Sequence, residues 1–441
     1  MRKPLIAALV AGAFLSLNAS ADDLLQVYKE ALVYDAQIAS ARAALEAGQE
    51  REVQARAGLL PTVALSGSYN RSDLNARSGG ITTDRNFNAK GYTLSMSQPL
   101  FRLANWETYQ QGKLSTAVSE AQFAQAQQDL IVRVAQAYFD VLAAQDALST
   151  VEAQKTAITE QLALAKRSFE VGTATITDTH EAQARFDLSL AQEAAARSEL
   201  EIRRAALQQI IGRQAGALAT LRPGVKINAP EPAAVEPWVL SAEQQNFNVL
   251  SQQLALEIAQ REIKRNRATH YPTVDLVASR SYNDQTGTAL SPTGSVSNNN
   301  AVGVQLAIPL FSGFAITSRV REAIALEDQA RANLENIRRT AAQGARQAFL
   351  GVNSGLVQVR ALEAAEISSQ SALESNRLGY QVGVRINIDV LNAQQQLFTT
   401  RRDLSRARYD TIVNGLRLKS AAGTLKEEDV ALVNSLLAQQ Q

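Results

Sequence analysis

Residues 130–172, LIVRVAQAYFDVLAAQDALSTVEAQKTAITEQLALAKRSFEVG, contain the repeat that decides the fold. Apolar or alanine side chains recur there with alternating spacings of four and three, and only Lys155 breaks the series. The repeating positions are Leu130, Val134, Ala137, Val141, Ala144, Leu148, Val151, Ile158, Leu162, Ala165 and Phe169. A sustained seven-residue repeat indicates a helix packed along a partner helix, as in a coiled coil.

The predicted helix begins well before this repeat. Residues 103–171 contain no proline and a single glycine. At ~1.5 Å per residue such a helix spans about 100 Å, whereas an ordinary globular helix has about 11–12 residues. The sequence therefore predicts a rod that ends at Gly172, since glycine readily adopts the left-handed conformation that closes a helix. A return helix is predicted over 178–211, with Asp178 and Glu181 as its start signal.

The first 21 residues read as a secretory signal peptide. Arg2 and Lys3 precede an apolar run, and Ala19-Ser20-Ala21 is a cleavage site, so the mature chain is expected to begin at Asp22. No other stretch has 18 uninterrupted apolar residues, which argues against a membrane-spanning helix.

Composition excludes several classes of function. The 441-residue chain has no cysteine, which rules out disulfides, thiolate metal sites and lipid attachment through an N-terminal cysteine. With 44 Lys and Arg against 43 Asp and Glu, the net charge of +1 gives no electrostatic reason to bind nucleic acid. Aromatic residues make up only 5% of the chain, and its abundant alanine suits close helix packing.

The chain consists of two related halves offset by about 211 residues. Pro61-Thr62-Val63 recurs as Pro272-Thr273-Val274, the turn 169–172 recurs as 380–383, and Gly212 matches Gly423. Alanine-rich helices resemble one another in general, but that does not explain matched prolines and glycines. The register therefore indicates an internal duplication.

Each half is expected to have the same elements in the same order. The first repeat is predicted over 22–212, with strands 62–70 and 90–98, a loop between them, and a helical hairpin over 103–211. A linker over 213–240 leads to a second repeat over 241–423. This repeat has strands 273–283 and 301–308, a loop that contains Asn298–Asn300, and a helical hairpin over 314–422. A C-terminal segment covers 424–441.

The strands alternate apolar with small polar residues over about nine positions. That pattern fits a membrane β-barrel strand, which needs about 9–11 residues, and it equally fits a soluble hairpin with one buried face. Membrane barrels start at about eight strands, and a four-stranded edge in lipid would leave backbone groups unsatisfied. If the strands enter a membrane, two or three chains must combine them. Arg280 shares parity with Val274 and Leu276, so it should face lipid unless a bulge intervenes or it lies above the apolar band.

The arrangement resembles a known family, the TolC-type outer membrane efflux and type I secretion channel proteins. The resemblance covers Asp22 to Leu437. It is carried by the duplicated pattern and by three passages, namely residues 171–178 (VGTATITD), 380–385 (YQVGVR) and 419–425 (KSAAGTL).

The resemblance implies an α+β membrane protein. Four strands per chain would form a trimeric 12-stranded β-barrel, continued through the periplasm by a long α-helical (coiled-coil) barrel. It implies a homotrimer in the outer membrane lipid of a Gram-negative bacterium. The partners it implies are a periplasmic adaptor (membrane-fusion) protein and an inner-membrane transporter, with no nucleic acid, cofactor or metal.

The resemblance also implies which residues line the periplasmic entrance. The gate residues are Asp178, Tyr380, Arg385 and Asp389, and Asn392 occupies a position where the family has a second aspartate. Cation block of the entrance should therefore be weaker than in a channel with both aspartates. Adaptor docking is expected at Val171, Gly172 and Thr173 of the first tip and at Val382, Gly383 and Val384 of the second.

Physics alone leaves two interpretations of these tips. Hydrogen bonds from Arg385 to Asp178 would contribute about 1.5–3 kcal/mol each, and an Asp389 ring would favour cations. The alternative is that both residues are solvated helix-cap residues.

No enzyme signature is present. His180 and His270 are far apart in the sequence, and phosphate loops and nucleophile–base groups are missing. Two rival functions stay open from the sequence: a periplasmic coiled-coil adaptor without a pore, and a structural surface filament.

Overall fold

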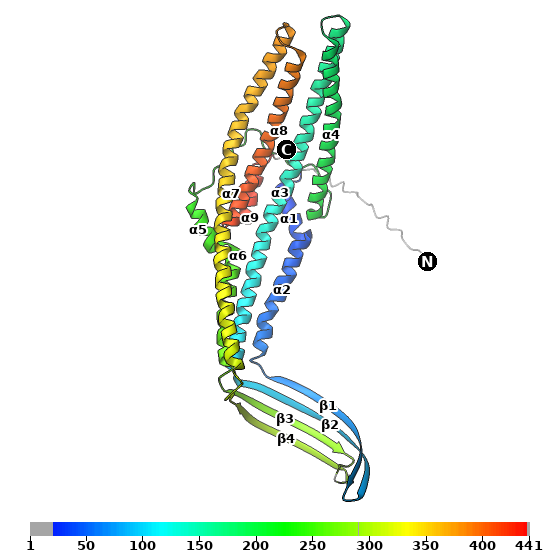
Figure 1. Cartoon of the computed structure of the whole chain (residues 1–441), viewed down its shortest axis with the longest axis vertical. Helices are drawn as coiled ribbons and strands as arrows, with labels where there is room; N and C mark the ends of the chain where they lie inside the picture. Colours follow the sequence, from blue (N-terminus) through cyan, green and yellow to red (C-terminus); the bar gives the residue numbers. More distant parts are fainter. Residues whose placement is uncertain (1–20, 290, 439–441) are drawn as a thin grey trace, which may run out of the picture. The chain divides into compact units, whose positions relative to one another are not determined.

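The computed structural model describes residues 21–289 and 291–438, so the predicted signal peptide lies outside the described residues except for Ala21. The chain divides into two compact units. We call Ser40–Gln127 with Val239–Gly344 the sheet unit, and the remaining residues up to Ala39, Gln128–Trp238 and Ala345 onwards the hairpin unit. Figure 1 shows the order of the elements along the chain.

The sheet unit contains one antiparallel sheet. Its strands are β1 (Thr62–Ser78), β2 (Ile81–Phe101), β3 (Thr273–Gln285) and β4 (Ser295–Ala307). They lie side by side in the order β1-β2-β3-β4, so β2 of the first repeat pairs with β3 of the second. β1 and β4 are therefore both edge strands, and each presents unpaired backbone groups in a single chain.

One face of this sheet is apolar and exposed. The register places Leu65 opposite Leu94 and Ala278 opposite Val302, and directly opposed residues share a face. Exposed apolar side chains on the two edge strands range from 61% to 79% accessible: Val63, Leu65, Val302, Val304 and Leu306. An exposed apolar face of this kind marks a surface for lipid or a partner.

Two predicted loops are wrong, because the strands extend through them. β1 continues to Ser78 and β2 starts at Ile81, so residues 71–89 are almost entirely strand. Gly79 (φ 59°) and Gly80 (φ 83°) close the hairpin, which suits a two-residue turn with positive φ at both positions. Asn298–Asn300 likewise pair with β3 inside β4. The polar composition led to the wrong prediction, because the backbone groups of these polar residues still form the hydrogen bonds of the sheet.

Arg280 remains on the apolar face. The ladder between β3 and β4 is regular, and the one irregularity between β2 and β3 lies at Pro99–Phe101, so no bulge turns Arg280 away from the parity of Val274. Arg280 lies opposite Leu94 on β2. The next residue on the same face of β3 is Tyr282, whose ring stacks on that of Tyr92 with 5.3 Å between the ring centroids. This position, beside a tyrosine pair, is at the end of the apolar band on β3.

The helices that precede each β-hairpin are broken at equivalent positions. Residues predicted as one helix form α1 (Leu24–Tyr34) and α2 (Ala36–Ala57), and their counterparts form α5 (Glu236–Gln245) and α6 (Phe247–Ala268). The breaks lie at Asp35 and Asn246, whose side chains accept hydrogen bonds from the next helix's first N–H groups. The predicted linker 213–240 is also shorter than expected, because α5 begins inside it.

Two long helical hairpins follow the β-hairpins, and the first helix of each begins in the sheet unit and continues into the hairpin unit. They are formed by α3 (Leu103–Glu170) with α4 (Ile176–Ile211), and by α7 (Ala315–Gln381) with α8 (Asn387–Ala421); a short helix, α9 (Glu427–Asn434), follows. Most seven-residue repeat positions on α3 are buried, including Leu130, Val134 and Ile158, whereas Phe169 near the tip is exposed. Lys155 interrupts the repeat because its ammonium pairs with Glu193 on α4 at 2.5 Å.

Among the described helices, none combines the length and the hydropathy that crossing a lipid bilayer requires.

Candidate functional site

The first tip is a tight turn between α3 and α4. Gly172 has φ 79°, and the N–H groups of Thr173 and Ala174 both donate to the Ser168 carbonyl at 2.8 and 3.1 Å. Thr175 caps α4 reciprocally with Asp178: the Asp178 N–H donates to Thr175 Oγ1 at 3.3 Å, and the Thr175 N–H donates to the Asp178 carboxylate at 3.0 Å. The predicted start pair, Asp178 with Glu181, is therefore wrong by three residues.

The second tip repeats this backbone turn but not the cap. Gly383 also has φ 79°, and the N–H groups of Val384 and Arg385 donate to the Gly379 carbonyl at 2.9 and 3.1 Å. The residue that corresponds to Thr175 is Ile386, which has no side-chain oxygen. Asp389 therefore receives only a weak bond from the Ile386 N–H at 3.4 Å.

Because of this difference, the carboxylates of the two tip aspartates have different partners. The carboxylate of Asp178 is occupied by its own capping box, including a 2.8 Å bond from the Thr175 hydroxyl. Asp389 instead lies 3.8 Å from the guanidinium of Arg385, whose side chain is 59% accessible. Within one chain the structure thus brings Arg385 to Asp389, while Asp178 has the helix-cap role that the alternative interpretation assigned to it.

Gly379 makes room for this arrangement. A Cβ atom at Gly379 would lie 2.7 Å from Cγ of Arg385, which is far inside normal contact distance. The absence of a side chain lets Arg385 fold back over the last turn of α7.

The expected docking residues are the most exposed apolar side chains of the tips. Val171 is 74% accessible, Val382 64% and Val384 75%. Exposed valines at the ends of two hairpins form small apolar surfaces that a partner could cover.

Tyr380 and Asn392 both contact other parts of their own chain, but Asn392 is exposed. Tyr380 is partly buried and packs against a cluster of Leu373, Val390 and Leu397. The Asn392 side-chain oxygen accepts a hydrogen bond from Arg185 of α4 at 3.0 Å, and Arg185 also donates to Gln395 at 2.5 Å. A guanidinium therefore lies beside Asn392, the residue that the resemblance implies stands in place of a second aspartate.

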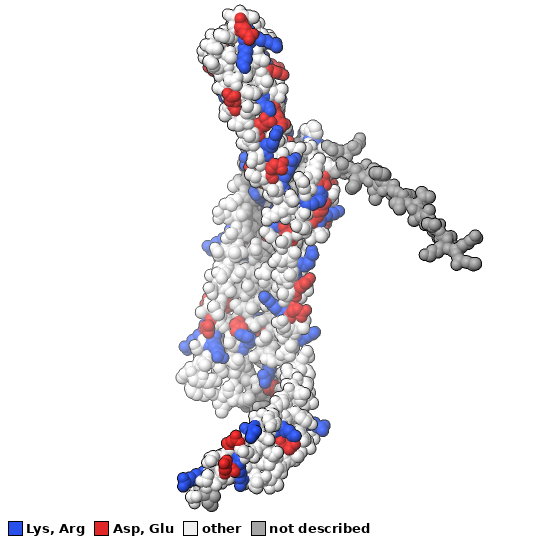
Figure 2. All heavy atoms as spheres, turned by 90° about the vertical axis from the view of Figure 1, so that its right-hand side faces the viewer, with Lys and Arg blue, Asp and Glu red and all other residues white. Residues whose placement is uncertain are grey.

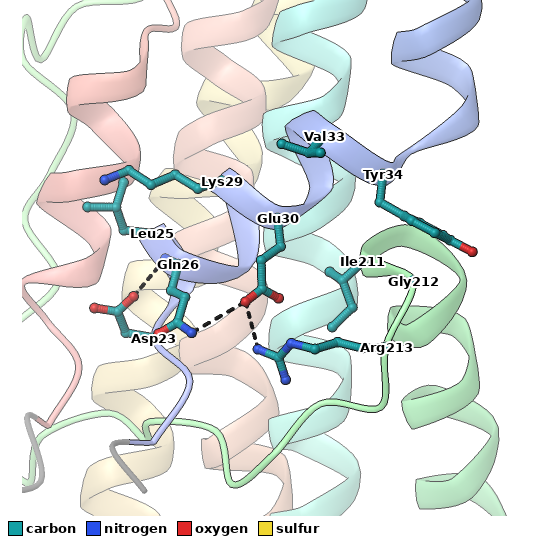
Figure 3. Close-up of a pocket in the computed structure, with 10 residues that line it drawn as sticks. All are labelled: Asp23, Leu25, Gln26, Lys29, Glu30, Val33, Tyr34, Ile211, Gly212 and Arg213. Atoms are coloured by element: carbon teal, nitrogen blue, oxygen red, sulfur yellow. Dashed lines mark hydrogen bonds and ion pairs between the residues drawn. The ribbon is translucent and has the colours of Figure 1, made fainter. Parts of the chain in front are cut away.

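A separate groove lies between α1 and the end of α4, far along the chain from the tips (Figure 3). Its lining combines apolar Leu25 and Val33 with Glu30 and Arg213, which form an ion pair at 2.8 Å. On the face that Figure 2 shows, positive and negative side chains are interspersed, in keeping with the net charge of +1. Among the described residues no group of His, Asp and Glu is arranged to hold a metal ion.

The fold and the tips can now be compared with known proteins. The family model described as outer membrane efflux protein matches residues 27–213 and again 238–424. The chain belongs to this family. The two matches are offset by the same 211 residues as the duplicated sequence, so the predicted internal repeat is confirmed.

Full-length relatives agree with this assignment. Outer membrane protein TolC of Vibrio cholerae serotype O1 is 34% identical over 438 residues, which covers 98% of both chains. TolC of Escherichia coli K12 is 32% identical and covers 99% of this chain. The alkaline protease secretion protein AprF of Pseudomonas aeruginosa is 34% identical over 96% of this chain and 89% of its own.

Solved structures show the same fold. CusC aligns with a TM-score of 0.78 over 91% of this chain and 92% of its own, at 20% identity. VceC of Vibrio cholerae aligns with a TM-score of 0.76 over 91% of this chain and 96% of its own, also at 20% identity. The predicted fold class is confirmed. As a member of this family, the chain is an exit channel of the outer membrane.

Sequence reasoning missed three residues near the tips: Thr175, Arg185 and Asn387. Thr175 could have been found, because Thr-x-x-Asp before an apolar run is a capping-box pattern. Arg185 and Asn387 gave no local signal, since their partners are on other helices.

Proposed function

We propose that three copies of this chain combine their sheets into one twelve-stranded barrel and their hairpins into one periplasmic tunnel, which carries cargo from an inner-membrane transporter and its adaptor to the exterior. The observation that carries the shared barrel is the four-stranded sheet with an apolar face and two unpaired edges in each chain, and the number of three chains is taken from the family resemblance. Pairing β4 of one chain with β1 of the next closes every edge, as a structure in lipid requires.

The direct test is to fractionate cells that express the full chain. The proposal expects an outer membrane protein that migrates as a trimer before heating and as a monomer afterwards. A protein found only in the soluble periplasm would instead support the adaptor or filament alternative.

Protein and small-molecule cargo both fit this duct. AprF and the Dickeya chrysanthemi relative, each 34% identical, are named as protease secretion proteins, whereas the Brucella suis relative named as an efflux protein is 25% identical. We propose secretion of proteins as one use of the channel, with the adaptor and transporter selecting the cargo.

We propose that the tips close the entrance through Arg385. Its guanidinium is exposed and only loosely paired with Asp389, so it is free to bond carboxylates or cap groups of a neighbouring copy. Three such bonds around an axis, each about 1.5–3 kcal/mol when charge-assisted, would hold the aperture shut and still yield to a docking partner. Because Arg185 lies beside Asn392, the cation preference from Asp389 alone should be weak.

The variant Arg385→Ser is expected to raise single-channel conductance in planar bilayers by several-fold, because it removes these bonds at all three tips. Arg167→Ser, which changes an exposed arginine in the last turn of α3, is the matched control and should leave conductance unchanged. Equal conductance for Arg385→Ser and the unmodified channel would contradict the role of Arg385.

Cysteines placed at Thr173 and at Val384 are expected to form crosslinks to the adaptor in cells, since these positions lie on the exposed tips. The natural chain has no cysteine, so each variant carries a single thiol. Ser149→Cys, exposed in the middle of α3, serves as the control. Capture of the adaptor by the control alone would place docking away from the tips.

A further inference from the structure

A buried pair of amides joins the two hairpins just behind the tips. Asn387 is the first residue of α8 and is fully buried, and Gln161 of α3 is 9% accessible. The Gln161 side-chain amide donates to the Asn387 side-chain oxygen. The Asn387 amide in turn donates to the backbone carbonyl of Asp178, in the first turn of α4, at 3.4 Å.

This pair connects three helices from both repeats. Gln161 belongs to α3, Asp178 to α4 and Asn387 to α8, so the chain of bonds crosses from the first hairpin to the second. An apolar cluster lies on the same helices: Ile158, Leu162 and Ala165 of α3 pack with Ala182 of α4 and Leu391 of α8. On another side, Gln161 lines a cleft with the polar residues Glu160, Arg377 and Gln394. Both amides are buried, so an amide that lost its partner could not regain the hydrogen bond from water. The bonded arrangement is therefore strongly preferred.

One member of the pair, Gln161, lies in the same cleft as a gate residue. Gln161, Tyr380 and Gln394 line one cleft between α3, α7 and α8. Asn387 is the first residue of α8 and follows Arg385 by two residues, so the short segment between the glycine turn and α8 joins them directly. A shift of Asn387 against Gln161 would therefore displace Arg385 through the backbone and change the packing of α8 against Tyr380.

We propose that Gln161 and Asn387 form a latch that fixes the second tip against the first hairpin of the same chain, and thereby positions Tyr380 and Arg385 in the closed entrance. This inference rests on the proposed gate. Both are positioning residues, because both side chains are buried inside a single chain. Leucines could fill a similar volume without fixing one orientation, whereas directional bonds between the amides favour a single alignment of the helices.

The test uses three variants of the full-length trimer: Gln161→Leu, Asn387→Leu and the double variant. Single-channel conductance is measured in planar bilayers, and the heating temperature that dissociates the trimer is measured in parallel. We expect all three variants to raise conductance by at least about twofold, as a shift of the closed population requires. The double variant should keep a dissociation temperature close to that of the unmodified trimer, because it leaves no amide without a partner.

Gln128→Leu is the matched control. Gln128 is also a buried glutamine of α3, 4% accessible, but its amide bonds the Leu425 carbonyl far from the tips. It should leave conductance unchanged. The latch is overturned if the double variant keeps the closed conductance, or if Gln128→Leu raises it equally. Failure of the unmodified protein to conduct at all would instead reject the proposed channel, so the two failures are distinguishable.

Discussion

Val304→Lys is expected to abolish assembly of the channel in the outer membrane. Val304 is 64% accessible on edge strand β4, between Val302 and Leu306 on the apolar face. A lysine on the lipid face of a barrel strand costs about 2–4 kcal/mol near the bilayer centre, and a trimer carries this cost three times. The measurement is the amount of heat-modifiable trimer recovered from outer membranes.

Gln305→Lys provides a control on the neighbouring position of the same strand. Successive strand residues point to opposite faces, so this lysine would face the polar interior of the barrel. The variant should assemble normally and alter only conductance or ion preference. Trimer recovery that falls equally for both variants, or for neither, would show that the apolar face is not in contact with lipid.

Arg213→Leu is expected to destabilise the hairpin unit by about 2–3 kcal/mol per chain. Arg213 follows the end of α4 and bonds both carboxylate oxygens of Asp22, at 2.9 and 3.0 Å. It also bonds Glu30 at 2.8 Å, as Figure 3 shows. Asp22 is only 7% accessible. Removing one partner of a buried pair typically costs 3–5 kcal/mol, and the cost is smaller here because Arg213 is 41% accessible.

The stability that the pair of Arg213 and Asp22 contributes is expected to decrease in acid. Burial raises the pKa of Asp22, but hydrogen bonds from Arg213 and the Gly216 N–H, with the charge of Arg213, outweigh it and hold that pKa below its ordinary 3.8. The stabilisation is therefore complete above pH 3.8 and is lost as the pH falls below it. The difference in trimer dissociation temperature between Arg213→Leu and the unmodified protein should shrink in that range.

Arg339→Leu is the control for Arg213→Leu. Arg339 pairs with Glu335 one helical turn away, but its side chain is 78% accessible, and exposed pairs contribute little. This variant should stay within about 0.5 kcal/mol of the unmodified protein. If it were as destabilised as Arg213→Leu, the buried network around Asp22 would not be the cause.

Long-range periodicity made most of the fold predictable. The seven-residue repeat on α3 and the offset of 211 residues predicted the paired hairpins, because both signals extend over tens of residues. The helix breaks at Asp35 and Asn246 were missed, since a single capping residue inside an alanine-rich stretch is a weak signal. The polar ends of the strands were missed for a related reason: a ladder forms between backbone groups, whatever the side chains.

The tips were located from the sequence, but their contacts were not. The glycine turns and the exposed valines follow from local sequence, and the structure places them as expected. Asp178 pairs with Thr175 because Thr175 is the cap residue of α4. In the second repeat Ile386 stands at the corresponding position and has no side-chain oxygen, so Asp389 pairs with Arg385 instead. The bonds of Gln161 and Arg185 to α8 join residues more than 200 positions apart, which no local pattern predicts.

The most direct test of the account is the number of chains in the membrane-embedded, conducting unit. The mature protein can be extracted from outer membranes in mild detergent, weighed intact by native mass spectrometry and reconstituted in planar bilayers. The account predicts a particle of three chains that conducts ions. A single chain that stays soluble without detergent and never conducts would contradict the claim that three open sheets close one barrel.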